Sequence, residues 1–551
     1  RKESSAASDV YKRQKFSNKI KFKMKLKITI IAILSLVLVI ACKAKKNTVT
    51  TKEIYSAITS KSKKNILFIA IDDLKPLLSN YGESQMITPN FDRLASLGMS
   101  FTNAHVQYAV CGASRASVMT GTNPDTNKVW DLHTDFRDSA PNLVSMPEHL
   151  INQGYESTGV GKIYHIPSAA KGHDGKTWSI PHEMPKNFDS KYGEPAFNHY
   201  QSPITKAKMV QLTKEAKAKG LKKGGKIRQY VLKRSKPSTE SIDVSDEAYN
   251  DGLFTQTALN QLEQLESGNK PWFLAVGYQK PHLPFTAPKK YWDLYDRSKI
   301  ELAKFQQTAE GTPKFAYHSF GELRAYSDIE NKLNVGDKLP EAKQRELIHG
   351  YMACVSYIDA QIGKLLDDLE KRNILDDTVI VLWGDHGFHL GDHTEWCKHS
   401  NFEQATRIPF MFAGPGVAKN QKSHHPVNLV DLFPTIFDLA GVDQHSQTDG
   451  KSLVNLLDAD AKTTIDTDFA YHQYMRGKKM GYAIRTDRYR YTEWHDNNYR
   501  SYNDYNSSKI SGRELYDYEK DPLETRNLVK DPAYKATVKL LKEKMKSHLS
   551  K

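Results

Sequence analysis

Cysteine is scarce in this chain, with only four residues among 551. So few thiols exclude a disulfide-stapled scaffold, because such scaffolds rely on several cysteine pairs in a short chain. Stability must therefore come from a hydrophobic core, and the length allows a large one. A single disulfide between Cys354 and Cys397 stays open, although Cys354 falls within a helical pattern.

The chain also lacks an apolar run long enough to span a bilayer comfortably. The longest candidate, residues 28–40, has thirteen positions, whereas a membrane helix needs about 20. Lysines precede this run, and Val39-Ile40-Ala41-Cys42 ends it. This pattern predicts a lipoprotein signal peptide over residues 24–41, with cleavage before Cys42 and lipid on that cysteine. A transmembrane helix is the alternative.

Such a signal places the mature protein outside the cytoplasm, in the periplasm or at the outer membrane, attached to a membrane only through its lipid. Lys43 favours the outer membrane, because aspartate there would favour inner-membrane retention in many bacteria. Residues 42–63 are then a tether. Residues 1–23 precede Met24 and are interpreted as an upstream extension without functional content.

The net charge of +15 is unevenly distributed. Residues 1–64 hold 17 Lys and Arg against 3 Asp and Glu, which leaves 62 against 61 for the rest. Within an insertion at about 200–240, residues 206–236 carry twelve basic side chains and the single acid Glu215. This block is interpreted either as a surface that attracts a polyanionic substrate or as a solvated, poorly ordered insertion. Few aromatic residues for base stacking and no nucleic-acid motif exclude DNA and RNA as partners.

The order of the apolar patterns predicts an α/β fold. Strand-like runs alternate with helical ones from residue 65 to about 445, as in a large, mainly parallel sheet sandwiched by helices. Residues 347–371 show the 3.6-residue period of a long amphipathic helix. After Gly441, short runs rich in Tyr and Arg indicate a smaller α+β subdomain with a short antiparallel sheet. We expect a main domain at 64–445 and a C-terminal subdomain at 446–551.

Carboxylates follow two of the buried strands. The apolar run Asn65–Ile71 leads into Asp72 and Asp73, and the run 378–383 leads into Gly384-Asp385-His386-Gly387. Ligands of open α/β sheets bind beyond the carboxyl ends of the strands, so these side chains are placed to hold a divalent cation. An acidic pair that ends one strand is usually a turn, but two such ends favour a metal site.

The segment Cys111-Gly112-Ala113-Ser114-Arg115 places a thiol where a strand and loop feed a helix. The first turn of a helix has unpaired N–H groups and the positive end of the helix dipole, so a tetrahedral oxyanion would bind beside residue 111. Arg115, one turn later, adds a positive charge facing the same point. Alone, such a match more often marks a buried cysteine in an ordinary helix.

Together these motifs resemble the sulfatase branch of the alkaline phosphatase superfamily, and most of all the iduronate-2-sulfatase group, over roughly residues 64–530. Seven blocks in order carry the resemblance. They are the strand with Asp72-Asp73, Thr88-Pro89-Asn90-Phe91-Asp92-Arg93-Leu94-Ala95, Cys111 to Arg115 with Thr120-Gly121, Gly159-Val160-Gly161-Lys162-Ile163-Tyr164-His165, residues 273–282 ending in Lys280-Pro281-His282, Gly384 to Gly387, and Trp396-Cys397-Lys398.

The resemblance implies a modified nucleophile and a bound cation. Cys111 would be oxidised by a formylglycine-generating maturase to formylglycine (3-oxoalanine), whose hydrate has one hydroxyl to attack sulfur and a second to expel sulfate. A divalent cation, Ca²⁺ by resemblance, would lower the hydroxyl pKa and clamp the sulfate. Its ligands would be Asp72, Asp73, Cys111 as formylglycine, Asp385 and His386.

The resemblance also assigns the remaining catalytic side chains. Arg115 and Lys162 would hold the formylglycine hydrate, and His165 would accept the proton that lets sulfate leave. His282 and Lys398 would bind the bridging and terminal oxygens and protonate the departing sugar hydroxyl. Each alone is more often a solvated surface residue, and the prediction depends on their joint arrangement.

Two positions depart from the commonest sulfatase pattern. Ala113 stands where most motifs have proline, so conversion of Cys111 is an inference. His386 stands where many sulfatases have asparagine, as in the iduronate group, and imidazole is an unusual ligand for Ca²⁺. The identity of the metal therefore stays open.

The sequence thus predicts an exported sulfuric ester hydrolase that acts on a sulfated polysaccharide or its oligosaccharides. By resemblance it is exo-acting on a terminal 2-O-sulfated uronate, and algal glycans such as ulvan are further candidate substrates. The alternatives are a phosphatase or phosphonate hydrolase of the same superfamily and a non-catalytic glycan-binding lipoprotein. Five residues next to the catalytic blocks are candidates for contact with the sugar, with ordinary packing as the alternative for each: Trp130, His133, Arg137, His389 and Trp396.

Overall fold

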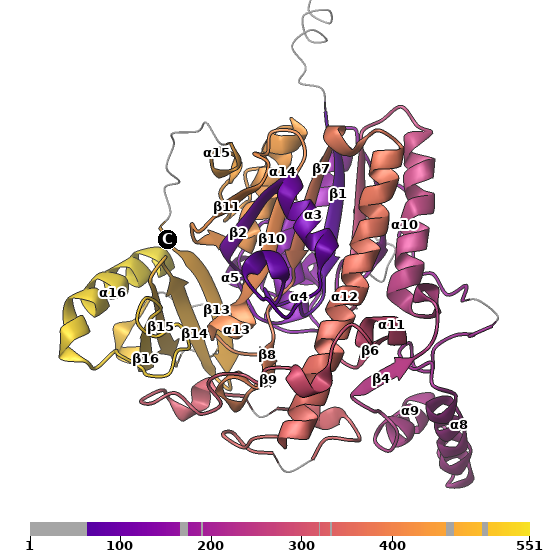
Figure 1. Ribbon diagram of the computed structural model, residues 1–551. Coiled ribbons are helices and arrows are strands. Elements are labelled where there is room, and N and C mark those ends of the chain that lie inside the picture. The colour runs from indigo at the N-terminus through magenta and orange to yellow at the C-terminus, as the bar shows by residue number, and fades with distance from the viewer. Residues whose placement is uncertain are drawn as a thin grey trace, which may run out of the picture. The chain divides into compact units, whose positions relative to one another are not determined.

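The computed structural model describes residues 63–165, 175–188, 191–318, 320–330, 333–458, 468–496, 498 and 505–550 (Figure 1). The predicted signal peptide, tether and upstream extension, apart from residue 63, lie outside the described residues. Within the described residues, no helix combines the length and the apolar character needed to cross a membrane.

The main sheet has eight strands and is parallel except for β10 (Arg407–Ala413). Its order is β11-β2-β10-β7-β1-β5-β3, and β12 also pairs with β2. The predicted strands are β1 (Asn65–Ile71) and β7 (Thr378–Gly384), which lie side by side near the middle of the sheet. The other strands are β2 (Gly98–His105), β3 (Glu156–Gly161), β5 (Trp272–Tyr278), β11 (Gln421–Ser423) and β12 (Val427–Asn428).

Side chains of β1 alternate between two hydrophobic clusters, one on each face of the sheet. Phe68 and Ala70 belong to the cluster that includes residues of α4 (Cys111–Thr120), α7 (Met146–Asn152) and α14 (Leu432–Ala440). Leu67 and Ile69 belong to the cluster that includes residues of α3 (Pro89–Leu97), α10 (Asn250–Glu266) and α12 (Glu341–Lys371). Burial on both faces explains why the strand is a continuous apolar run, as expected for a central parallel strand. The long helix predicted at 347–371 is part of α12 (Glu341–Lys371).

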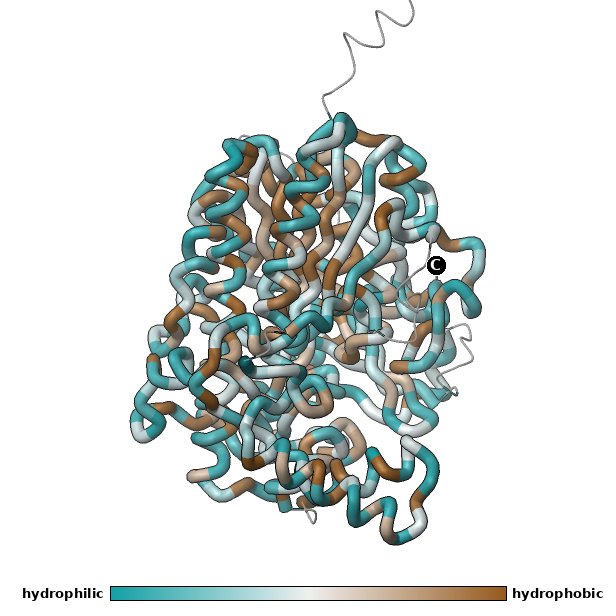
Figure 2. Tube along the Cα trace, turned by 90° about the vertical axis from the view of Figure 1, so that its right-hand side faces the viewer, coloured by the Kyte–Doolittle hydropathy of each residue, from teal (hydrophilic) through white to brown (hydrophobic). Residues whose placement is uncertain are grey.

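Helices cover both faces of the sheet (Figure 1), and apolar residues follow its strands (Figure 2). The covering helices are α3 (Pro89–Leu97), α4 (Cys111–Thr120), α7 (Met146–Asn152), α10 (Asn250–Glu266) and α14 (Leu432–Ala440), together with α12. The shorter helices are α5 (Pro124–Asn127), α6 (Phe136–Ser139), α11 (Lys289–Trp292), α13 (Glu403–Thr406) and α15 (Val454–Leu457). This arrangement is the predicted α/β fold.

The predicted antiparallel sheet is formed by β13 (Ala470–Arg476), β14 (Lys479–Arg485), β15 (Tyr489–His495) and β16 (Ile510–Asp517). Helix α16 (Lys535–Leu549) contributes Leu541 and Met545 to a cluster that continues into the core of the main sheet. The two sheets therefore share hydrophobic side chains, and both belong to one compact unit, residues 63–551.

The basic insertion folds as two helices, α8 (Pro203–Ala218) and α9 (Gly224–Leu232). A small cluster of Tyr200, Met209, Leu212 and Val231 packs between them and the preceding loop. The chain then enters β4 (Thr239–Ile242), which pairs in parallel with β6 (Phe285–Pro288). A further two-stranded pair joins β8 (His389–Leu390) to β9 (Trp396–Cys397).

Candidate active site

Four strand ends bring charged residues to one edge of the main sheet. Ile71 at the end of β1 lies opposite Gly384 of β7 and Tyr278 of β5, and Gly277 lies opposite Gly161 of β3. The segments that follow these strands therefore emerge at one level, beyond the carboxyl ends of the strands. They carry Asp72 and Asp73, Asp385 and His386, residues 279–282, and Lys162.

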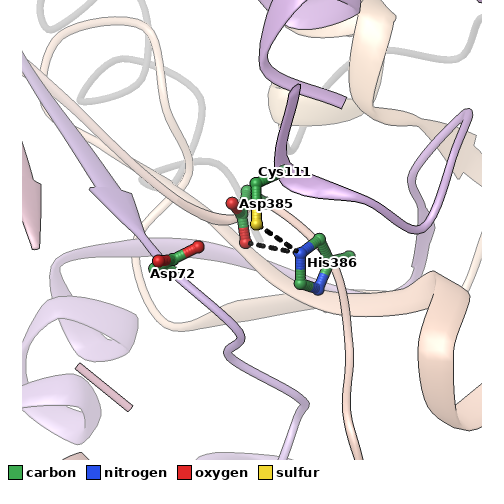
Figure 3. Close-up of side chains that lie close together, drawn as sticks. All are labelled: Asp72, Cys111, Asp385 and His386. Atoms are coloured by element: carbon green, nitrogen blue, oxygen red, sulfur yellow. Dashed lines mark hydrogen bonds and ion pairs between the residues drawn. The ribbon is translucent and has the colours of Figure 1, made fainter. Parts of the chain in front are cut away.

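Cys111 is the first residue of α4 and follows Val110, whose backbone is extended (φ −153°, ψ 136°). The thiol is buried, and Sγ lies 3.2 Å from His386 Nε2 (Figure 3). Burial, and then the Asp72 carboxylate, raise the pKa of the thiol well above its usual range. Because the thiolate is the nucleophilic form, an unmodified Cys111 in this setting is a weak nucleophile.

Ala113 is compatible with the same helix start as the more common proline. It is the third residue of α4 and fully buried. The backbone N–H groups of the first helical turn have no partner within the helix, so neither alanine nor proline changes the helical hydrogen bonding there. The departure from the commonest motif therefore leaves the position of Cys111 unaltered.

Four donor side chains surround one point beside α4. Ligand atoms of Asp72, Cys111, Asp385 and His386 lie within 4.8 Å of one another, and all four residues are buried (Figure 3). The Nδ1–H of His386 donates to the Gly387 carbonyl at 3.0 Å, which leaves the Nε2 lone pair facing Asp73 Oδ1 at 3.3 Å and Asp385 Oδ1 at 3.6 Å. Burial lowers the pKa of His386 to about 4, so the ring is neutral near pH 7.

This arrangement fits a divalent cation. Among the described residues, Asp72 Oδ1 is a buried carboxylate oxygen with no hydrogen-bond partner. Carboxylate oxygens and an imidazole lone pair that face one another in a buried site repel unless a positive charge lies between them. The hydrogen bond from Nδ1–H to a backbone carbonyl also fixes the tautomer that a metal-binding histidine needs.

Asp73 belongs to a second group, with Cys111 and His282, that overlaps the first at Cys111. Its backbone N–H donates to Asp385 Oδ1 at 2.9 Å, and Lys398 Nζ donates to both of its carboxylate oxygens at 3.0 Å. Its φ of 61° lies in the left-handed region, a strained conformation that is concentrated at functional sites. The other four predicted ligands thus lie around Cys111, with Asp72 and Asp73 in different groups.

Arg115 is fully buried and held by three groups. Its Nε donates to Asp385 Oδ2 at 2.8 Å, and Nη1 donates to the carbonyls of Lys162 and Ile163. Its Nη2 lies 3.7 Å from Asp72 Oδ1 and has no hydrogen-bond partner in the part of the chain that the structure describes. One buried cationic donor therefore remains available to an anion at this point.

Lys162 and His165 lie on the loop after β3. Lys162 Nζ forms an ion pair with Asp72 Oδ2. Burial alone would raise the pKa of Asp72, but the charges of Lys162 and Arg115 hold it well below its usual range. Burial and the charge of Lys162 lower the pKa of His165 to about 4, and its buried Nδ1 has no hydrogen-bond partner within the described ranges. Neutral His165 is therefore able to accept a proton.

His282 lies on the loop after β5 and points Nε2 at two carboxylates. Its Nδ1–H donates to the Leu283 carbonyl at 2.6 Å, while Nε2 lies 3.3 Å from Glu322 Oε1 and 3.9 Å from Asp73 Oδ2. Burial and the neighbouring Lys398 lower the pKa of His282 to about 3. Lys398 itself stays charged, because Asp73 and Glu322 outweigh burial and raise its pKa.

Glu322 is a half-buried acid of this site that was not predicted from the sequence. Its Oε1 accepts from Lys398 Nζ at 2.8 Å, and its Oε2 lies 3.1 Å from His399 Nε2. Burial would raise its pKa, but Lys398 and His399 hold it well below the usual range. The residue precedes the short 3₁₀ turn Leu323–Ala325 in a long connection, where no strand, helix or motif marks it.

Three of the five candidates for sugar contact have packing roles. Trp130 is 7% exposed, and its Nε1–H donates to a carboxylate oxygen of Asp125 at 2.8 Å. His389 is fully buried, with Nε2 2.9 Å from Ser400 Oγ, and Trp396 is buried in β9. Their side chains are therefore not available to a ligand in this conformation.

The other two candidates differ from each other. The Arg137 guanidinium donates to Glu148 Oε2 at 2.6 Å and lies 4.8 Å from the ring centroid of Phe136, so it is already engaged. His133 is exposed. The disulfide left open for Cys354 and Cys397 does not form, since both are buried free thiols.

The strand ends of a mainly parallel sheet thus bring together a thiol, carboxylates and imidazoles, with buried cations around them. This arrangement suits an enzyme that hydrolyses an anionic ester. Comparison with protein families identifies the class. The family described as "Sulfatase" matches residues 64–442, and "N-sulphoglucosamine sulphohydrolase, C-terminal" matches residues 391–551. The chain belongs to the sulfatase family of sulfuric ester hydrolases.

Individual relatives span nearly the same region. Iduronate 2-sulfatase of Homo sapiens is 31% identical over 532 residues, which covers 85% of this chain and 91% of the relative. N-acetylglucosamine-6-O-sulfatase of Bacteroides thetaiotaomicron is 27% identical, with 88% and 86% coverage. The phosphonate monoester hydrolase of Agrobacterium radiobacter has a similar fold, with a TM-score of 0.64, 20% identity, and coverage of 88% and 95%.

Proposed function

We propose that the protein removes O-sulfate groups from a sulfated polysaccharide or its oligosaccharides. One observation carries the proposal: Cys111, at the start of α4, lies in a buried cluster with Asp72, Asp385 and His386. Beside this cluster, Nη2 of Arg115 has no hydrogen-bond partner among the described residues. The named activities of the relatives, on iduronate and N-acetylglucosamine sulfates, support a sulfated sugar as the substrate.

The proposed nucleophile is formylglycine at position 111, formed from Cys111 by a maturase. As the hydrate it supplies a hydroxyl to attack sulfur, and a bound divalent cation, proposed to be Ca²⁺, would make that hydroxyl more acidic. Asp72, Asp73, Asp385 and His386 would hold the cation. Arg115 and Lys162 position the hydrate, and neutral His165 accepts the proton that lets sulfate leave.

The opposite end of the site serves the leaving sugar oxygen. Lys398 carries a fixed positive charge and donates a hydrogen bond to the negative charge that develops there. His282 is neutral while the site holds only its own side chains. A bound sulfate ester adds negative charge beside Nε2 and raises its pKa, so the ring can carry the proton that the sugar hydroxyl takes up.

The finer proposal concerns substrate and location. We propose exo-action on a terminal 2-O-sulfated uronate, with algal glycans such as ulvan as further candidates. The predicted signal peptide and Cys42 support an exported, lipid-anchored protein of the periplasm or outer membrane.

Two measurements test the proposal. Mass analysis of the peptide containing residue 111 is expected to show formylglycine, which is lighter than cysteine. A panel of defined sulfated oligosaccharides, with matched phosphate and phosphonate esters, is expected to give turnover on sulfate esters. Unmodified cysteine together with glycan binding would favour a non-catalytic binder, and faster turnover of phosphorus esters would favour a phosphatase or phosphonate hydrolase.

A further inference from the structure

The helical insertion, which we call the basic hairpin (residues 203–236, with α8 and α9), carries a large excess of positive charge. Of its twelve basic side chains, ten are exposed: Lys208, Lys214, Lys217, Lys219, Lys222, Lys223, Lys226, Arg228, Lys233 and Arg234. Within the described part of the chain, none of the twelve forms an ion pair with a carboxylate. Like charges at such density repel one another, and an anionic partner would relieve this cost.

The basic hairpin is a built surface rather than a solvated loop. Tyr200, Met209, Leu212 and Val231 form its own small core. Some of its cations lie over aromatic rings, with the Arg234 guanidinium 3.7 Å from the ring centroid of Tyr230. Fixed cations bind a polyanion at a lower entropic cost than cations on a flexible segment do.

Its base is attached next to the active site. The chain leaves the hairpin into β4, which pairs with β6, and β6 directly follows the loop that carries His282. The backbone N–H of Lys236 donates to Ser327 Oγ at 2.9 Å, and the N–H of Ser327 donates to the Lys236 carbonyl at 2.8 Å. Ser327 belongs to the segment that contains Glu322. In Figure 1 the hairpin accordingly lies at the end of the molecule toward which β1 runs.

Cations link the two regions. Lys236 Nζ lies 4.0 Å from the ring centroid of Tyr326, and it interacts electrostatically with both Arg228 of α9 and Glu322 of the site. The Arg228 guanidinium lies 4.8 Å from the ring centroid of Phe197. Burial and the nearby charges of Lys280, Lys236 and Arg228 hold the pKa of half-buried His199 well below its usual range. The hairpin cations Arg228 and Lys236 therefore lie around the same side chain as Lys280, a cation of the loop after β5.

We propose that the basic hairpin is a docking surface for the anionic chain of a sulfated polysaccharide, whose reacting sulfate lies at the active site. The proposal rests on the proposed function, which it extends from one sulfate ester to the neighbouring sulfates and carboxylates of the chain. Lys236 and Arg228 form the junction between the docking surface and the site.

A polysaccharide suits the hairpin better than an anionic lipid surface. The exposed apolar residues of α8, Ile204 and Val210, are six positions apart and so about 120° apart around the helix axis. They do not form the single apolar stripe by which an amphipathic helix enters a membrane. The attachment of the hairpin beside the catalytic edge also favours a ligand long enough to contact both places at once.

The test compares two triple variants of the full-length protein with equal loss of charge. One is Lys214→Gln, Lys222→Gln, Lys226→Gln in the hairpin. The other, a control, is Lys535→Gln, Lys539→Gln, Lys546→Gln on α16, at the opposite side in Figure 1. All six lysines are exposed. Binding of heparin at low ionic strength, turnover of 4-nitrophenyl sulfate, and binding of phosphatidylglycerol vesicles are measured for both variants and the wild type.

The hairpin triple is expected to raise the Kd for heparin about tenfold, an effect that fades as salt screens the charges. The control is expected to stay within about twofold, and turnover of the small ester is expected to be unchanged in both.

Equal weakening by both triples, or wild-type heparin binding by the hairpin triple, would overturn the proposal. Loss of vesicle binding with heparin binding intact would replace the polysaccharide by a membrane. If the wild type hydrolyses no sulfate ester, the proposed function is wrong. The comparison of heparin binding between the two triples still shows whether the hairpin binds a polyanion.

Discussion

The two halves of the active site are built from different kinds of structure. The strand-end half consists of Asp72, Cys111, Arg115, Lys162, Asp385 and His386, which follow parallel strands or begin α4. The loop half consists of His282, at the far end of the loop after β5, and of Glu322, Lys398 and His399, which lie on connections outside the sheet. The strand-end half holds its residues through sheet register and buried hydrogen bonds, whereas the loop half depends on one carboxylate, Glu322, which contacts the other three side chains.

The largest effect is expected at the centre of the strand-end half. Cys111→Ala removes the residue from which the nucleophile is formed, so kcat on any sulfate ester is expected to fall at least about a thousandfold. The matched control is Cys354→Ala, which truncates another buried thiol on α12, away from the site. Circular dichroism should show both variants folded, with activity retained only in the control. Turnover by Cys111→Ala close to the wild-type rate would show that residue 111 does not supply the nucleophile.

Removal of the cation should affect the strand-end half next. A chelator is expected to abolish turnover, and added Ca²⁺ to restore it. A ligand at about a hundred times its Kd stabilises the folded state by about 2.7 kcal/mol, so Ca²⁺ should also raise Tm. Asp385→Asn is expected to lower kcat/KM about a hundredfold or more and to lose this rise in Tm. Asp431→Asn, another buried carboxylate, serves as the control. Full activity in the chelator would contradict a catalytic cation.

The loop half is tested through Glu322→Gln, which keeps the shape and removes the charge shared by His282 and Lys398. The expected result is a roughly tenfold to hundredfold lower kcat on sugar sulfates, because an alkoxide leaving group needs a proton. Turnover of 4-nitrophenyl sulfate should change far less, since nitrophenolate leaves without one. The exposed Glu330→Gln on the same connection is the control. An equal loss on both substrates would show that Glu322 supports the whole site instead of the leaving group.

The same division explains what the sequence could predict. The carboxyl ends of parallel strands meet at one edge, so Asp72 and Asp385 were placed together by the strand pattern alone. The helix start at Cys111 and the position of Arg115 followed from the local pattern in the same way. Glu322 could not be predicted, because its place depends on a long connection without periodic structure that folds back over the sheet edge.

Packing determines which of the residues predicted for sugar contact are exposed. Adjacency in sequence to a catalytic block placed Trp396 and His389 near the site, but the β8–β9 pair buries both side chains. Which face of a short strand is covered depends on elements far away in the sequence. The basic block shows the converse: its charge alone did not distinguish a folded segment from a solvated, poorly ordered insertion, and the apolar residues of its small core show that it is folded.

The smallest predicted effect concerns Glu395, a buried acid three residues before Lys398. Glu395 accepts from the backbone N–H of His318 at 2.8 Å, and Oε2 lies 3.6 Å from His318 Nε2. Burial raises the pKa of Glu395 to about 8, from 4.5 in an unfolded chain. The folded protein therefore binds this proton more tightly, so the stabilisation is complete below pH 4.5 and is lost as pH rises through 8.

Glu395→Gln keeps a neutral amide there at every pH. It is expected to raise the free energy of unfolding by about 1 kcal/mol or more at pH 9 and to leave it nearly unchanged at pH 5. Denaturant titrations at the two pH values measure the difference, and a gain of the same size at both would show that the titration of Glu395 is not its cause.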